Sequence, residues 1–82
     1  MADALKGIQQ AVLSQDGLED SQRQDLLDNV EYLATAANTP PDQRNRGIIT
    51  SVLLALSTAA ATGDQLQRAL DTWGAVLRSL LP

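Results

Sequence analysis

The sequence predicts an all-α protein: a small bundle of four helices, or of three with a kinked last one, built on an antiparallel helical hairpin. Apolar residues recur at steps of three and four along most of the 82-residue chain. The apolar fraction of 44% comes almost wholly from Leu, Ala, Val and Ile, which suits closely packed helices. Pro40 and Pro41 break the pattern at mid-chain and separate two helices. The length allows a single domain, residues 1–82.

Residues 1–17 are predicted to form an N-terminal helix, or else to be the end of a linker from a larger protein. Ile8 and Val12 follow helical spacing, and the helix should end near Ser14, before the turn-forming Gln15-Asp16-Gly17. Gly7 should weaken this helix by about 1 kcal/mol relative to alanine.

Residues 18–38 are predicted to form an acidic amphipathic helix with one solvated face. Ser21 and Gln24 have the spacing of a capping box at its start. Acids near the start suit the positive end of a helix dipole. The apolar stripe consists of Leu26, Leu27, Val30, Leu33, Ala34 and Ala37, and the other side carries Asp25, Asp28 and Glu31.

A hinge follows this helix, at Pro40, Pro41, Arg44 and Gly47. Pro40 should end the acidic helix, and Pro41 suits the first position of the next one. Arg44 and Arg46 could clamp a carboxylate or phosphate near the start of that helix. We favour the other interpretation, in which Arg44 bonds back to the acids or the C-terminal carbonyls of the preceding helix.

Residues 41–62 are predicted to form a helix whose apolar stripe is too wide for one neighbour to cover. The stripe comprises Ile48, Ile49, Val52, Leu53, Ala55, Leu56, Ala59, Ala60 and Ala61. The helix should therefore be central in the bundle or shared between chains. The nearly uncharged run Ile48–Gly63, about 16 residues, is shorter than the roughly 20 that a membrane span needs.

Residues 64–81 are predicted to form an amphipathic C-terminal helix. Gly63 should take a left-handed conformation that ends the preceding helix, and Asp64 with Gln67 should cap the new one. Trp73 lies in the apolar stripe and either packs in the core or anchors an interface. Its neighbour Gly74 would allow a second helix or a partner side chain to approach closely.

The net charge of −4 argues against nucleic-acid binding, because the six basic residues are scattered and form no cluster. Residues 1–41 carry seven acids and two bases, and residues 42–82 carry three acids and four bases, so the halves could attract each other within or between chains. Cysteine and histidine are absent, which excludes disulfides and zinc sites of the usual kind. The first dozen residues do not form a secretory signal, so the sequence predicts a cytoplasmic protein.

We expect no enzymatic activity and no cofactor. Asp25, Asp28 and Glu31 could in principle hold a metal ion or act as paired carboxylates, but they lie on a polar helix face without partner acids. Serines and threonines are present without a histidine, and the single lysine, Lys6, is far off in sequence. A solvated or interchain-paired face is the favoured interpretation of the three acids.

Residues 18–82 resemble short helical C-terminal assembly modules appended to uncharacterised bacterial proteins, including effectors of anti-phage and related conflict systems. The resemblance rests on Trp73-Gly74, on Leu33-Ala34-x-x-Ala37 and on Pro40-Pro41-x-x-Arg44-x-x-Gly47-x-Ile49. It implies an assembly or partner-recruiting tail without catalytic residues. This chain differs in lacking lysines in the third helix and in lacking an effector domain.

The sequence therefore predicts a non-catalytic protein-protein interaction module, a self-associating oligomerisation domain of a bacterial, defence-related protein. A homodimer is the favoured form, because two-fold interfaces are the commonest. The alternatives are a membrane-active helical effector and a monomeric adaptor or inhibitor of a larger partner. The predicted interface consists of Val52, Leu56, Leu70, Trp73, Leu77 and Leu80.

Overall fold

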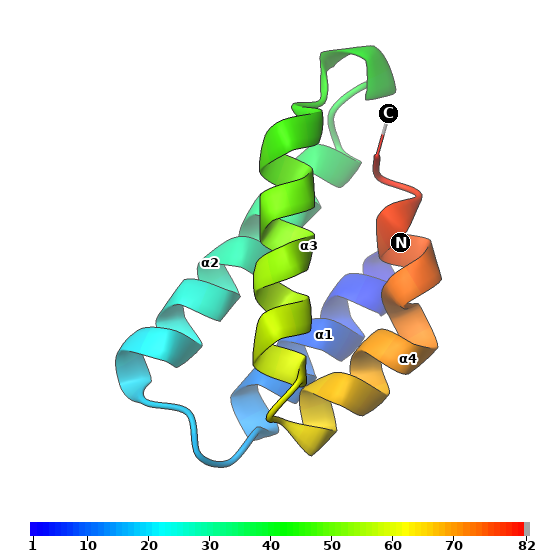
Figure 1. The fold of residues 1–82 in the computed structure, drawn as a ribbon. Helices are drawn as coiled ribbons and strands as arrows, with labels where there is room; N and C mark the ends of the chain where they lie inside the picture. The colour runs from blue at the N-terminus through cyan, green and yellow to red at the C-terminus, as the bar shows by residue number, and fades with distance from the viewer. Residues whose placement is uncertain (82) are drawn as a thin grey trace.

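The computed structural model describes residues 1–81, and within them it has four α-helices and one 3-10 turn (Figure 1). Helices α1 and α3 each pack against both α2 and α4, so the four helices form a closed ring of contacts. The predicted four-helix bundle is confirmed, and the alternative with a kinked last helix is wrong because the chain leaves the helical path between α3 and α4. The elements are α1 (Ala2–Ser14), α2 (Asp20–Ala37), η1 (Pro41–Gln43), α3 (Arg46–Ala60) and α4 (Asp64–Arg78).

Helices α2 and α3 run in opposite directions and are joined by the turn that contains η1 (Figure 1). Pro41 begins η1 instead of the third helix, so the predicted start of that helix at residue 41 is wrong. The backbone of Arg44 is extended, which separates η1 from α3. Asn45 then caps α3, its Oδ1 accepting a hydrogen bond from the Ile48 amide at 3.0 Å.

Each helix turns one apolar stripe toward a common core. Helix α1 belongs to this core, because the side chains of Ile8 and Val12 are fully buried, and it is therefore not a loose linker end. The radius of gyration of 11.8 Å matches the roughly 12 Å expected of a compact domain of this length. The buried residues are Ala4, Ile8, Ala11, Val12, Leu26, Val30, Leu33, Ala36, Ile49, Val52, Leu56, Ala60, Leu66, Leu77 and Leu80.

The capping box of α2 lies earlier than predicted. Glu19 is the N-cap, and its amide donates to Gln22 Oε1 at 3.0 Å. The predicted pair, Ser21 and Gln24, lies inside the helix, where Gln24 donates instead to Asp28 Oδ1 at 3.0 Å. Both pairs have cap-like side chains at the same spacing, and the structure selects the one closer to the preceding turn.

Helix α4 is capped from a distance by Gln15, which follows α1. Gln15 Oε1 accepts hydrogen bonds from the Gln65 amide at 2.8 Å and the Leu66 amide at 3.2 Å. Gly63 has an extended backbone (φ −123°), so its predicted left-handed conformation is wrong. A Cβ atom at Gly63 would lie 2.8 Å from Gln15 Cδ, which shows that this glycine makes room for the capping side chain.

Arg23 joins the start of α2 to the end of α1. Its guanidinium donates to the carbonyl oxygens of Val12, Leu13 and Gln15, at 3.0 Å for the last two. These carbonyls lie in or just after the last turn of α1, where a helix lacks backbone donors and favours a cation. The short connection between α1 and α2 is thereby held at both of its ends.

Candidate functional site

The predicted interface residues lie mainly inside the single chain. Leu56 and Leu77 are 0% exposed, Leu80 is 2% exposed and Val52 is 7% exposed. The predicted interface is wrong for these four residues on the folded chain, because the packing of α3 and α4 within the bundle already buries them. Only Leu70 and Trp73 of the predicted set are half-buried.

Trp73 packs against α1 of its own chain. A Cβ atom built on Gly7 would lie 2.5 Å from Trp73 Nε1 and 3.0 Å from Trp73 Cδ1, so the indole occupies the space that a side chain there would take. Nothing lies within 4 Å of a Cβ built on Gly74. The glycine that admits a close approach is therefore Gly7, and the prediction for Gly74 is wrong on the folded chain.

Arg44 is the one hinge residue whose side chain connects helices. Its Nε donates to the carbonyl oxygens of Ala36 at 2.8 Å and Thr39 at 2.9 Å, and its Nη1 donates to that of Leu80 at 3.2 Å. The favoured interpretation is confirmed in its carbonyl form, and the arginine also joins the end of α2 to the end of α4. These bonds engage Nε and Nη1 of the guanidinium and fix the arginine against the turn.

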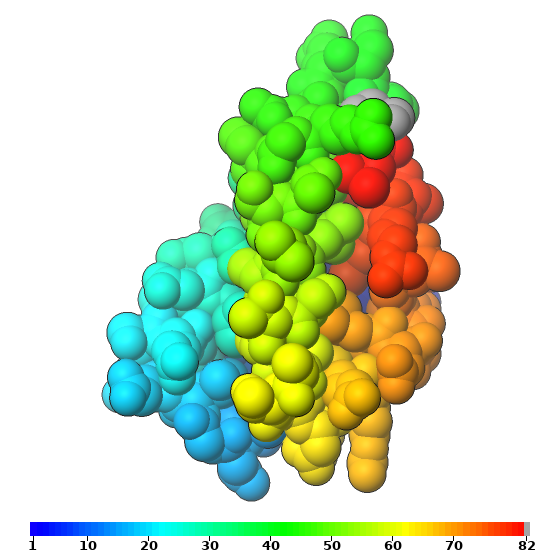
Figure 2. Space-filling model, viewed as in Figure 1, coloured from blue at the N-terminus to red at the C-terminus, as the bar shows by residue number. Residues whose placement is uncertain are grey.

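The outer face of α3 differs from the surfaces around it because it is uncharged and partly apolar. Figure 2 shows α3, green to yellow, as a ridge between the cyan α2 and the orange α4. Leu54 is 65% exposed and Ile48 is 45% exposed. After Arg46, every exposed residue up to the start of α4 is uncharged: Gly47, Ile48, Thr50, Ser51, Leu54, Ser57, Thr58, Ala61 and Thr62.

A groove between α2 and α3 adjoins this face. It has a volume of about 680 Å³ and lies along the middle and the C-terminal end of α3. Asp25 on α2 and Leu54 on α3 both line it, so an acid faces the uncharged ridge. The lining is Leu18, Gln22, Asp25, Leu26, Asn29, Ser51, Leu54, Ala55, Thr58, Ala59 and Thr62.

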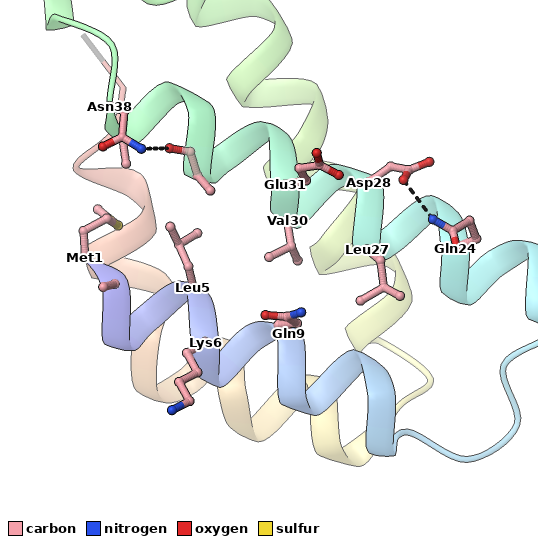
Figure 3. Close-up of a pocket in the computed structure, with 13 residues that line it drawn as sticks. Met1, Leu5, Lys6, Gln9, Gln24, Leu27, Asp28, Val30, Glu31 and Asn38 are labelled. Atoms are coloured by element: carbon pink, nitrogen blue, oxygen red, sulfur yellow. Dashed lines mark hydrogen bonds between the residues drawn. The ribbon is translucent and has the colours of Figure 1, made fainter.

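A second groove, of about 830 Å³, lies between α1 and α2. Figure 3 shows Leu5 and Val30 pointing into the space between the two helices, with Leu27 beside them. Asp28 and Glu31 lie on its α2 side. The groove offers an apolar floor with acids on its margin, and the residues that line it include no histidine or cysteine.

The three acids of α2, Asp25, Asp28 and Glu31, are all exposed, as expected of a polar helix face. Among the described residues, no group of three or more acids, histidines or cysteines is placed to hold a metal ion. Within residues 1–81, no helix has both the length and the apolar character that a membrane crossing requires.

Leu54 is not among the residues of the predicted apolar stripe, whereas Ile48 is. Leu54 is two residues from Leu56, about 200° around an α-helix, so it points away from the core that Leu56 faces. The signal that could have found it is this phase: an apolar side chain opposite the main stripe, in a segment without charges to solvate that side.

Comparisons with known proteins do not place the chain in a family. No family model matches it, and neither a curated protein nor a solved structure shows significant similarity to it. The resemblance of residues 18–82 to bacterial assembly modules therefore stays a prediction.

Proposed function

We propose that this protein is a non-catalytic interaction module that self-associates through the outer face of α3. The observation that carries the proposal is the uncharged exposed surface of α3, which includes Leu54 at 65% exposure and Ile48 at 45%. The centres of protein interfaces are depleted in charged residues, and exposed apolar patches commonly mark such interfaces.

The exposed faces of α2 and α4 support this choice by contrast. The exposed positions of α2 include Asp20, Asp25, Asp28 and Glu31, and those of α4 carry charges of both signs. Such faces are readily solvated as they stand. The outer face of α3 instead gains free energy when it leaves water, at about 25 cal/mol per Å² of apolar area buried.

The proposal keeps the predicted function and changes the surface that performs it. The predicted interface used residues that the folded chain already buries, whereas Leu54 and Ile48 are accessible without any unfolding. The resemblance of residues 18–82 to bacterial assembly tails supports the same function, in a bacterial cytoplasmic protein, and adds no residue to this face. A homodimer is the simplest closed assembly.

The test is the absolute mass in solution, measured by light scattering on a sizing column over a wide range of dilution. We expect a whole multiple of the chain mass of 8.7 kDa for the natural sequence. Leu54→Asp should reduce this to the single-chain mass, because a charge would be buried at the centre of the interface. Far-UV circular dichroism should show unchanged helicity.

A matched variant is Thr72→Asp, which introduces the same charge on the exposed side of α4. It should assemble as the natural sequence does. A single-chain mass for the natural protein at all concentrations would refute self-association. An unchanged mass for Leu54→Asp would also refute the assignment to α3.

A further inference from the structure

We infer that the groove between α1 and α2 binds an amphipathic helix of another protein, one that carries basic residues along one side of its apolar stripe. This inference goes beyond the proposed self-association and does not depend on it. Helices α1 and α3 lie across the ring from each other, since each packs against both α2 and α4. A partner in the α1–α2 groove and a second copy on the outer face of α3 therefore occupy different sides of the molecule.

The groove is long enough for several turns of a helix. On α2 its lining runs from Gln24 to Asn38, fourteen positions or about 21 Å of helix. On α1 the lining runs from Met1 to Gln9, eight positions or about 12 Å. A helix lying in the groove can therefore contact both walls over about two turns and α2 over about four.

The floor of the groove is apolar. Figure 3 shows Leu5 of α1 and Val30 of α2 pointing into the space between the two helices. Leu5, Leu27, Ala34 and Ala37 are only half-buried, so part of their apolar surface faces water in the single chain. The two alanines end in methyl groups, which leaves room for a larger side chain from a partner. An apolar stripe that covers this floor gains free energy by leaving water.

The walls favour a helix over an extended peptide as the occupant. The backbone donors and acceptors of α1 and α2 are used within each helix along the groove, so an extended peptide would find no backbone partners there. Its own amides and carbonyls would lie unpaired against an apolar floor, which is costly. A helix satisfies its backbone internally and presents only side chains to the groove, as in other helix-in-groove complexes.

The charges at the margins determine which helix fits. Asp28 and Glu31 lie on the α2 side and are exposed, three residues apart on the helix. Asp28 Oδ1 accepts a hydrogen bond from Gln24 at 3.0 Å, and an ionised carboxylate has further acceptor positions. Lys6 is the one basic side chain among the described residues that line the groove, and in Figure 3 it points away from α2. Basic residues on the α2 side of a bound helix would therefore meet two carboxylates.

A second copy of the chain does not offer such a helix. Within residues 1–81, the exposed large apolar side chains are confined to α1 with its N-cap and to α3. Helix α1 has one basic side chain, Lys6, and α3 has one, Arg46, at its first residue. Neither helix can present two bases on neighbouring turns to Asp28 and Glu31. The occupant is therefore a different protein.

The experiment measures the binding of two synthetic peptides to the full-length protein by fluorescence anisotropy. Both peptides have about eighteen residues, enough to form a helix on binding, and a leucine stripe at helical spacing. One peptide carries lysines beside the stripe, and the other carries glutamates at the same positions. We expect the lysine peptide to bind about tenfold more tightly than the glutamate peptide. Replacing its leucines by alanine should abolish binding, because the floor is apolar.

The double variant Asp28→Lys/Glu31→Lys tests the location of the site. It should weaken binding of the lysine peptide about tenfold and make the glutamate peptide the tighter ligand. The matched variant is Asp25→Lys/Asp71→Lys, which changes exposed acids of α2 and α4 outside the groove. Each replacement of an acid by lysine adds two charges, so both double variants raise the net charge from −4 to zero. The matched variant should keep its preference for the lysine peptide.

Circular dichroism of both double variants should show the helicity of the natural protein, because all four changed side chains are exposed. Equal effects of the two double variants would show that the peptide responds to net charge alone, and the inference would then be overturned. Failure of the lysine peptide to bind, or binding that survives the loss of its leucines, would overturn it as well.

The fate of this inference can be separated from that of self-association. Leu54→Asp, which changes the outer face of α3, should bind the lysine peptide as the natural sequence does. A natural protein that is a single chain at all concentrations but binds the peptide through Asp28 and Glu31 would contradict the proposed function and support the groove. Loss of peptide binding in Leu54→Asp with unchanged helicity would instead place the peptide on α3 and overturn the inference.

Discussion

Replacing Gly7 by alanine tests whether Trp73 packs on α1. A methyl group at this position would lie 2.5 Å from Trp73 Nε1 and 3.0 Å from Trp73 Cδ1, shorter than a normal van der Waals contact. The indole or the helix must then shift, and overpacking of this kind typically costs about 1–3 kcal/mol. Against this, alanine gains about 1 kcal/mol over glycine in a helix interior.

The same substitution at Gly74 isolates the clash. Gly74 also lies inside a helix, and nothing occupies the space within 4 Å of the new Cβ, so Gly74→Ala should stabilise the fold by about 1 kcal/mol. The helix-propensity gain is common to both variants and cancels in their difference. We therefore expect Gly7→Ala to be less stable than Gly74→Ala by about 1–3 kcal/mol.

Urea unfolding followed by circular dichroism and by the fluorescence of the single tryptophan would measure this difference. In thermal unfolding at one protein concentration, Gly7→Ala should have a melting temperature lower than that of Gly74→Ala by about 4–8 °C for each kcal/mol of this difference. In a Trp73→Leu background, where a smaller side chain faces α1, the penalty of Gly7→Ala should shrink or disappear. If Gly7→Ala stabilises the protein as much as Gly74→Ala does, the indole does not lie on α1 and the reasoning fails.

The other contacts between helices lead to three further predictions. Gln15→Ala should lower the free energy of unfolding by about 1–3 kcal/mol in urea titrations, because two amides at the start of α4 lose their acceptor; an unchanged midpoint would contradict the long-range cap. Arg44→Ala should cost more stability than Arg46→Ala by the same assay, because only Arg44 joins the ends of α2 and α4, and equal losses would count against that role. Leu56→Ala should cost about 2–5 kcal/mol by leaving a cavity, whereas Leu54→Ala, measured on dissociated protein, should change stability by less than about 0.5 kcal/mol; a reversal of this order would show that the two sides of α3 are exchanged.

Local signals in the sequence were enough for the helices themselves. The apolar steps of three and four located all four helices, and the end of α1 at Ser14 is confirmed. The paired prolines located the turn between α2 and α3, since their fixed backbone ends one helix wherever they occur. These features depend on residues close together in sequence, so periodicity and backbone restriction suffice to predict them.

The contacts that close the bundle were not predictable in this way. Gln15 caps a helix that starts about fifty residues later, and Gly7 receives the side chain of Trp73 from the other end of the chain. From the neighbouring sequence alone, Gln15 is a turn residue and Gly7 is a weak helix former. Their roles depend on which helices become neighbours, and nothing in the adjacent sequence specifies that.

The candidate site also depends partly on local sequence and partly on the packing of the helices. The sequence by itself determined that the third helix has more apolar surface than one neighbour can cover and that acids line one face of the second. Only the tertiary structure decided which apolar residues remain outside: packing α3 between α2 and α4 buries Val52 and Leu56 and leaves Leu54 and Ile48 exposed. Periodicity gives the spacing of residues around a helix, whereas the position of its neighbours decides which side faces water.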